Sequence, residues 1–409
     1  MQPHDPRFVP DSAYSWQRLA LSVTLGTIMC VGSWSVIVAL PAVQADFGVD
    51  RGAASWPYTF MMLAFAAGAI GMGRLVDRFG MVRPIVMAGA LLGLGYAGAG
   101  LAPGVLTFAL AHVLIGFGAS LGFAPLMADV SHWFVKRRGL AVGVCAAGNY
   151  LAGALWSPLI QQVIEAHGWR ALHLGIAALM VLLVAPMAPL FRRRIAARDY
   201  ASAEAASNAA RRELGLSPRT VMIAVSVAGF GCCMAMAMPQ VHIVAYCADL
   251  GYGAARGAEM LALMLGLGII SRVASGFMAD RFGGLNVLLF GSAMQALALF
   301  LYLFFDSLAS LYIISGVFGL FQGGIVPMYA VIARELLPPR EAGQRIGVII
   351  LATIIGMAAG GLASGYIFNA TGSYQMAFLN GLAWNLVNIA ILAWLIAWPR
   401  LKAGRAQPA

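Results

Sequence analysis

The chain has 409 residues, of which 61% are hydrophobic and only 10% are charged, and its formal net charge is +10. A soluble enzyme has about 25% charged residues, so this composition excludes an ordinary globular domain. The apolar residues form blocks of about 20–26, the length that crosses a hydrocarbon core of roughly 30 Å as a helix. The sequence therefore predicts an all-α polytopic membrane protein.

Twelve apolar segments can be counted, in two groups of six. They lie at about 18–43, 53–73, 84–101, 105–130, 139–164, 170–191, 219–247, 255–279, 285–304, 308–334, 343–369 and 374–398. The stretch between the groups is rich in Arg, Ala and Glu, a composition that also suits a surface helix. The predicted organisation is a first half at 1–191, a cytoplasmic linker at 192–218 and a second half at 219–409.

The basic residues are distributed unevenly between the two predicted sides of the membrane. Of 26, the side with both termini and the linker has 22, the other side has Arg51, Arg170 and Arg256, and Arg272 lies inside a span. The positive-inside rule predicts that both termini are cytoplasmic in a cell membrane, inner or plasma. This placement explains the net charge without a nucleic-acid partner. The five cysteines have no metal-ligand spacing, and we expect neither a metal nor another cofactor.

Two predicted loops share the pattern Gly-x-x-x-Asp-Arg-x-Gly, one after the second segment and one after the eighth. The residues are Gly73, Asp77, Arg78 and Gly80 in the first copy and, 203 positions later, Gly276, Asp280, Arg281 and Gly283. Pro125 and Pro327 repeat at an offset of 202, and Gly168 and Gly372 at 204. Two halves related by a parallel repeat predict a substrate site at the midplane between them, with alternating access by rocking.

The two loop copies, GRLVDRFG and GFMADRFG, resemble the signature loop of the major facilitator superfamily. The resemblance covers nearly the whole chain and implies the fold of a secondary transporter. Met81 and Val82 stand where the family usually places basic residues, which weakens the charge network expected for the first loop. Trp133-Phe134 followed by Arg137 to Ala141, Gly168-Trp169-Arg170 and the Arg in segment eight are similar to the monocarboxylate transporter and oxalate–formate antiporter branch.

Arg272 is the only charge between Met260 and Ala279 and lies eight residues before Asp280, so about 12 Å from the helix end. A charge at that depth costs about 2.5–3.5 kcal/mol on insertion scales. The side chain is either a structural lock paired with a carboxylate or a ligand for a substrate anion. No other span holds a deep Asp or Glu, which favours the anion ligand. The resemblance implies the same, because the family's segment-eight Arg binds a carboxylate.

The resemblance also bears on the charge of the substrate. Relatives that carry dicarboxylates add a second cation in segment eleven, where this chain has Thr353. One central cation indicates a monoanion. Proton-coupled relatives have a carboxylate four residues before the segment-eight Arg, where this chain has Gly268. The resemblance therefore leaves the proton site open.

Several polar and aromatic residues lie at membrane depth. His242 and His112 can change charge near neutral pH and are candidates for proton coupling, with His242 also a candidate for substrate binding; each can instead be a neutral His bonded across helices. The amides of Asn149 and Gln322 are either substrate ligands or bonds that join helices. Trp34 suits the aromatic wall of the site, or a core or lipid-facing position.

The Asp-Arg pairs of the two loops are predicted to belong to a gate. An Asp at a helix end can bind the N-terminus of a neighbouring helix and nearby Arg side chains, and such contacts break when the halves rock. Asp129 lies near Arg137 and Arg138 in the sequence and is predicted to join the same cytoplasmic latch. A purely structural role for these residues is the alternative.

The predicted function is secondary transport of a small monocarboxylate such as lactate or pyruvate, by proton symport. The expected partners are the organic anion, protons and the bilayer, with the protein acting as a monomer. Efflux or exchange of another organic anion, an aromatic acid or a drug is the alternative, and a membrane sensor for an organic acid is one from another class. Glycine pairs such as Gly116-x-Gly118, Gly266-x-Gly268 and Gly360-Gly361 lie inside apolar spans, which indicates helix packing rather than nucleotide binding or an enzyme.

Overall fold

A computed structural model describes residues 10–134, 137–193, 216–337 and 339–405, and every regular element in these ranges is a helix. The first half contains α1 (Ala13–Met29), α2 (Val31–Phe47), α3 (Arg51–Ala54), α4 (Trp56–Phe79), α5 (Val82–Gly100), α6 (Val105–Ala119), the 3-10 turn η2 (Ser120–Gly122), α7 (Ala124–Trp133), α8 (Arg138–Met187) and the 3-10 turn η3 (Ala188–Phe191). The second half contains α10 (Pro218–Asp249), α11 (Ala254–Phe282), α12 (Gly284–Leu301), α13 (Leu308–Gln322), α14 (Ile325–Leu336), α15 (Pro339–Thr371) and α16 (Gln375–Arg405).

The predicted linker at 192–218 lies mostly outside the described residues, as does the surface helix suggested for it. Residues 192, 193 and 216–218 of the linker are described. Ser217 accepts a hydrogen bond from the backbone N–H of Thr220, and Pro218 opens α10. A Ser cap followed by Pro in the first turn is a strong helix-start signal. The Ser side chain accepts from a backbone N–H that has no partner within the helix, and Pro has no N–H to leave unpaired.

Eleven stretches of the described chain are long and apolar enough to cross a membrane. One of them, Gly139–Phe191, has 53 residues, and a straight helix of that length would span about 80 Å, more than twice the bilayer core. It is divided at Gly168, where φ is 80° and ψ is 162°, a conformation that glycine adopts without strain. The chain therefore crosses twelve times, in agreement with the predicted segments 139–164 and 170–191.

The two halves repeat the same breaks in the backbone. The fourth crossing is interrupted between α6 and α7, and the tenth between α13 and α14. Gly80 ends α4 with φ of 78°, and Gly283, 203 residues later, ends α11 with φ of 80°. Gly168 and Gly372 likewise have φ of 80° and 68°. The repeat seen in the sequence is thus a repeat of helix ends and turns.

Equivalent glycines bring the second and fourth crossings of each half together. A Cβ on Gly116 of α6 would lie 2.1 Å from the Met61 carbonyl oxygen of α4, and one on Gly319 of α13 would lie 2.2 Å from that of Met264 in α11. The close packing predicted for the glycine pairs is confirmed at Gly116, Gly118, Gly268, Gly360 and Gly361. It is wrong for Gly266, where a Cβ would meet no atom within 4 Å.

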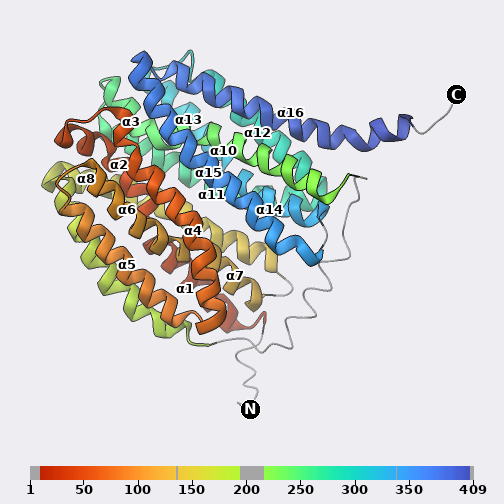
Figure 1. Cartoon of the computed structure of the whole chain (residues 1–409), viewed down its shortest axis with the longest axis horizontal. Helices are drawn as coiled ribbons and strands as arrows, with labels where there is room; N and C mark the ends of the chain where they lie inside the picture. The colour runs from red at the N-terminus through yellow and green to blue at the C-terminus, as the bar shows by residue number, and fades with distance from the viewer. Residues whose placement is uncertain (1–9, 135–136, 194–215, 338, 406–409) are drawn as a thin grey trace.

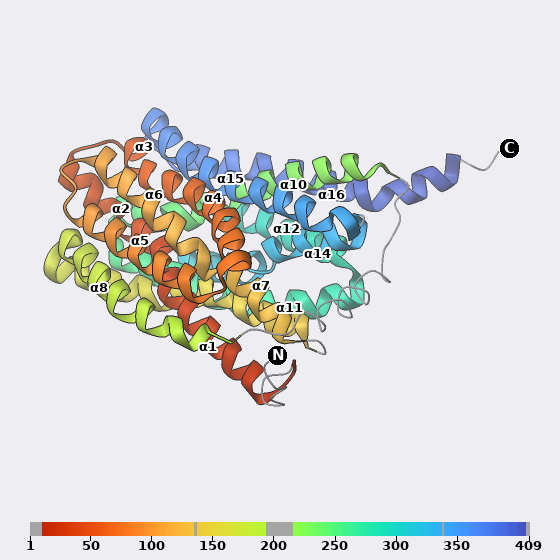
Figure 2. The same cartoon turned by 60° about the horizontal axis from the view of Figure 1, so that its bottom comes forward.

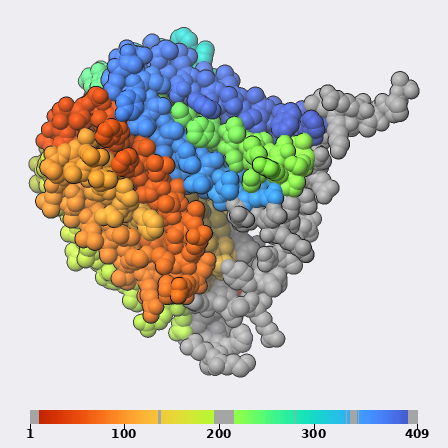
Figure 3. All heavy atoms as spheres, in the orientation of Figure 1, coloured from red at the N-terminus to blue at the C-terminus, as the bar shows by residue number. Residues whose placement is uncertain are grey.

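The helix bundle has two ends, which carry different elements. The α3 end carries α3 and the turn at Gly372, and the repeat-loop end carries the loops after α4 and α11 and the start of α1. In Figures 1 and 2, α3 lies at the upper left, while α7 and α14 lie on the opposite side. Figure 3 shows the first half, red to yellow-green, against the second half, green to blue, along one seam.

Candidate functional site

Arg272 lies in the middle of α11 with only 7% of its surface exposed. Its Nε donates to the Gly323 carbonyl at 3.1 Å, and its Nη1 donates to the Ala146 carbonyl at 2.7 Å. Its Cζ stands 3.8 Å from the centroid of the Tyr150 ring. Gly323 lies between α13 and α14, whereas Ala146 and Tyr150 belong to α8 of the first half. The guanidinium therefore contacts both halves at mid-depth.

No Asp or Glu that the structure describes pairs with Arg272, so the lock interpretation has no partner. The ion pairs of the described residues include Arg18 with Asp129, Arg51 with Asp249, Arg170 with Asp46 and Arg256 with Glu259, none of which involves Arg272. Nη2 of Arg272 has no hydrogen-bond partner among the described residues. A planar cation with a free edge is suited to a carboxylate, which binds guanidinium through parallel charge-assisted hydrogen bonds.

Gln322, the last residue of α13, is completely buried beside this cation. Its Oε1 accepts from the Tyr150 hydroxyl at 2.8 Å and from Nε2 of Gln240 in α10 at 3.0 Å. Its Nε2 has no partner in the described structure. Because two donors hold the amide oxygen, the NH2 group is the part of this side chain left to bind a substrate oxygen.

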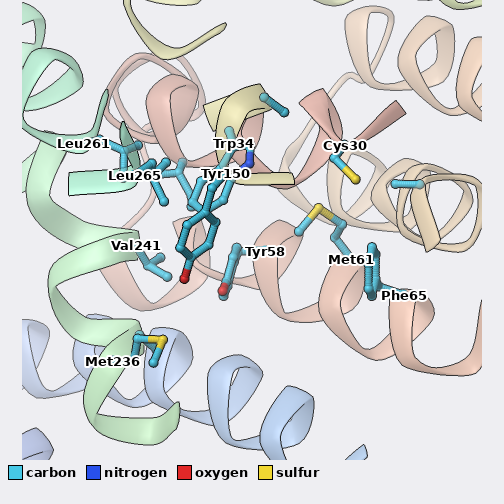
Figure 4. Close-up of a cluster of buried hydrophobic side chains, with 14 of the residues drawn as sticks. Cys30, Trp34, Tyr58, Met61, Phe65, Tyr150, Met236, Val241, Leu261 and Leu265 are labelled. Atoms are coloured by element: carbon cyan, nitrogen blue, oxygen red, sulfur yellow. The ribbon is translucent and has the colours of Figure 1, made fainter. Parts of the chain in front are cut away.

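Trp34 and Tyr150 form an aromatic wall between α2, α8 and α11. Trp34 donates from Nε1 to the Asn149 carbonyl at 2.9 Å, and its ring meets Tyr150 edge-on at 6.2 Å. Figure 4 shows both rings with Tyr58 on one side and Leu265 of α11 on another. The structure thus brings Trp34, Gln322 and Arg272 together around Tyr150, while Asn149 joins them through its backbone.

His242 does not lie with these residues. Its Nε2 donates to the Gly361 carbonyl at 2.8 Å, and its ring lies 5.6 Å from Tyr374. It makes no described contact with Arg272, so the structure does not bring it together with the other predicted substrate ligands. The reason is its position in α10, seven residues before the helix ends at the α3 end, on a face turned to α15 and α16.

His112 is also remote from Arg272 and lies within the first half. Its Nδ1 donates to the Phe108 carbonyl at 2.8 Å, and its Nε2 is buried without a partner in the described structure. Its ring lies 6.0 Å from His173, which packs on Trp169. Sequence reasoning did not single out His173, because nothing in the sequence shows that the fourth and sixth crossings meet at these positions.

Among the described side chains, the repeated loops form none of the gate contacts predicted for them. Asp77 and Arg78 are exposed, and neither they nor Arg281 makes an ion pair or hydrogen bond within the described structure. The side chain of Asp280 lies outside the described residues. Gly73 and Gly276 face open space, and Gly80 and Gly283 provide the turns. A surface pocket of about 420 Å³ at the first loop is lined by Arg78, Phe79, Gly80, Met81, Val82, Arg83, Phe191 and Arg192.

Asp129 binds Arg18, and no described contact joins it to Arg137. Nε and Nη2 of Arg18 donate to the two carboxylate oxygens at 2.8 and 3.0 Å, and its Nη groups also donate to carbonyls of η3. Arg137 is exposed and lies over the Trp16 ring instead; the side chain of Arg138 is not described. The helix α7, which carries Asp129, ends at Trp133. The pair joins elements of the first half only.

Arg51 forms a buried contact between the halves that the sequence did not reveal. It is 5% exposed, pairs with Asp249 at 3.0 Å and donates to the Tyr374 hydroxyl. Its backbone N–H donates to Asn369 Oδ1 at 3.0 Å, and its guanidinium lies over the Phe368 ring. The only sequence signal was that Arg51 is one of three basic residues on the sparsely charged side. The halves are therefore joined both at the α3 end and at mid-depth.

Twelve crossings in two repeated halves, with a buried cation and polar side chains where the halves meet, define a solute transporter of the alternating-access type. Comparison with known families matches residues 23–306 and 260–409 to the Major Facilitator Superfamily. The chain belongs to this superfamily of secondary transporters, which are not enzymes.

Proteins similar to this chain include transporters with two different names. Monocarboxylate transporter 13 of Bos taurus is 27% identical over 405 residues, covering 98% of this chain and 93% of that protein. The agnestins efflux protein AgnL12 of Paecilomyces divaricatus is 25% identical and covers 71% of this chain and 65% of that protein. A bacterial homologue of the human lysosomal transporter Spinster shares the fold, with a TM-score of 0.68, 14% identity and coverage of 97% and 98%.

Proposed function

We propose that this transporter carries a small monocarboxylate of the lactate or pyruvate class in symport with a proton. The observation that carries the proposal is the Arg272 guanidinium, buried between both halves with no described carboxylate partner. A substrate anion supplies the missing countercharge. The similarity to monocarboxylate transporter 13 supports the same substrate class.

In this proposal the carboxylate binds the free Nη2 edge of Arg272. The unpaired Nε2 of Gln322 donates to the hydroxyl or keto oxygen next to the carboxylate, and Trp34 and Tyr150 form the apolar walls. Thr353 stands where dicarboxylate carriers of the family have a second cation, and its hydroxyl donates to its own helix at Ile350. A single cation then favours a monoanion over a dianion.

The proton site is proposed at His242, with His112 as the second candidate. In both rings one nitrogen donates to a backbone carbonyl and the other is buried without a described partner. A carbonyl can only accept, so the unpaired nitrogen is the one that can take a second proton. His242 lies beside Tyr374, and the Tyr374 hydroxyl accepts a hydrogen bond from Arg51 in the contact between the halves. Its charge can therefore influence that contact.

The orientation and the gate are part of the same proposal. The distribution of basic residues supports cytoplasmic termini in a cell membrane, with the repeat loops on the same side. We expect Asp77, Arg78, Asp280 and Arg281 to form the predicted gate contacts when the α3 end opens. We also expect the protein to work as a monomer. In the present structure the α3 end is held by Arg51.

Purified protein in liposomes tests the substrate and the role of Arg272. We expect saturable uptake of labelled lactate that an inward proton gradient drives above equilibrium. Arg272→Gln should abolish it, whereas Arg256→Gln should not, because Arg256 pairs with Glu259 on the surface. Wild-type uptake rates in the Arg272 variant would contradict the proposal. Saturable flux that ignores the gradient would exclude symport, and flux in pure liposomes would exclude a sensor.

Efflux or exchange of an aromatic acid is a second candidate. The wall formed by Trp34, Tyr150 and Tyr58 favours it, and one similar protein is named as an efflux protein. Benzoate would then compete with labelled lactate at lower concentration than unlabelled lactate does. The reverse order of potency favours the small aliphatic acid.

A further inference from the structure

Uncharged groups of the protein itself surround the positive charge of Arg272. Two carbonyl oxygens accept from Nε and Nη1, and the face of Tyr150 covers the guanidinium at 3.8 Å. The ring quadrupole attracts a cation over its face, and the attraction is strongest where water is excluded. These groups stabilise the positive charge without any anion.

The Tyr150 ring is held in this position from three sides. Its hydroxyl donates to Gln322 at 2.8 Å, and its edge meets Trp34. It also fills the space that Gly268 leaves open one turn before Arg272, since a Cβ on Gly268 would lie 2.7 Å from the ring carbons. The sequence therefore places a glycine where a larger residue would push the ring away from the cation.

We propose that Tyr150 is a positioning residue that stabilises the Arg272 charge in the empty transporter, so that the halves can rearrange without substrate. The inference rests on the proposed role of Arg272 as substrate ligand and goes beyond it. A buried cation with no partner would raise the free energy needed to rearrange the protein without substrate. The protein could then only exchange one substrate molecule for another. With Tyr150 in place it performs net transport.

Binding and release of substrate follow from the same geometry. The carboxylate can approach Nη2 while the ring still covers the face of the guanidinium. Tyr150 and Ala146 lie four residues apart on the same face of α8, so both keep their contacts with the cation while the anion binds and leaves.

The test compares net uptake of labelled lactate into empty liposomes with exchange into lactate-loaded liposomes. In Tyr150→Leu we expect net uptake to fall about tenfold relative to exchange, because the aromatic face is lost. In Tyr150→Phe the ratio should stay near that of the wild type, because the face remains and only the bond to Gln322 is lost. A merely structural role for Tyr150 would lower both fluxes together.

Gly268→Ala provides a second variant that leaves Tyr150 in the chain. Its methyl group would displace the ring and should lower the same ratio. An unchanged ratio in both Tyr150→Leu and Gly268→Ala overturns the inference, as does equal loss of both fluxes in the two variants. Wild-type protein that only exchanges lactate also overturns it. Wild-type protein with no saturable lactate flux of either kind contradicts the proposed function instead.

Discussion

At the scale of the residue, the buried amide of Gln322 decides what kind of acid the site prefers. An unpaired buried donor costs roughly 1–3 kcal/mol, which a substrate oxygen can recover. We expect Gln322→Leu to raise the KM for lactate about tenfold and to change the KM for propionate little, because propionate lacks the oxygen next to the carboxylate. Initial rates of uptake in proteoliposomes measure both constants.

Gln295→Leu is the matched control for this prediction. Gln295 is a buried amide too, and it donates to the Cys232 carbonyl within the second half. Its loss should lower stability without changing the preference between lactate and propionate. Equal KM increases for both acids in the Gln322 variant would show that this amide only joins helices.

At the scale of the element, glycine carries the contact between the second and fourth crossings of each half. A methyl group at Gly116 or Gly319 would meet a backbone carbonyl near 2.1 or 2.2 Å, and helix backbone cannot withdraw as a side chain can. We expect Gly116→Ala and Gly319→Ala each to destabilise the protein by about 1–3 kcal/mol. Thermal unfolding in detergent measures this.

Gly266→Ala is the control at this scale, since the added methyl group meets nothing within 4 Å. Alanine also favours a helix over glycine by about 0.8–1.0 kcal/mol, so this variant should be as stable as the wild type or more so. Similar melting temperatures for all three variants would mean that the close approaches relax without cost.

At the scale of the whole molecule, Arg51 holds the halves together at the α3 end. Asp249 is partly exposed, with 35% of its side chain accessible, so the ion pair is screened by solvent. We expect Arg51→Ala to shift the equilibrium toward an open α3 end by about 1 kcal/mol, roughly fivefold in population. Spin labels at Ala45 and Met376, which are exposed on opposite halves, would then show a larger fraction of long distances.

Arg170→Ala is the control for this experiment. Arg170 lies at the same end but pairs with Asp46 and the Ala102 carbonyl, all in the first half. Its loss should leave the distances unchanged. The five native cysteines are free and buried, and they are replaced before labelling. Unchanged distances in the Arg51 variant would show that the halves are held elsewhere.

The twelve apolar segments, the repeat and the charge inside a span at Arg272 could all be predicted from the sequence. Each of these properties depends on residues that are adjacent in the sequence. They are the length of an apolar run, a positive-φ glycine at a helix end, and a charge inside a hydrophobic stretch. The family could be predicted for the same reason, because the repeated loops are short contiguous patterns. Trp34 and Gln322 could be named as candidates because Gln322 is an amide and Trp34 a large aromatic residue at membrane depth.

Which of these residues meet depends on how the helices pack in the folded protein. Tyr150 and Gln240 were not predicted as site residues, although both donate hydrogen bonds to Gln322. Asp129 pairs with Arg18, which lies 111 residues away in the sequence. His242 turned toward the α3 end, away from Arg272. Helix rotation and contact faces are set by packing between elements far apart in the chain, where each span is apolar on every side. Hydropathy therefore does not reveal which face turns inward.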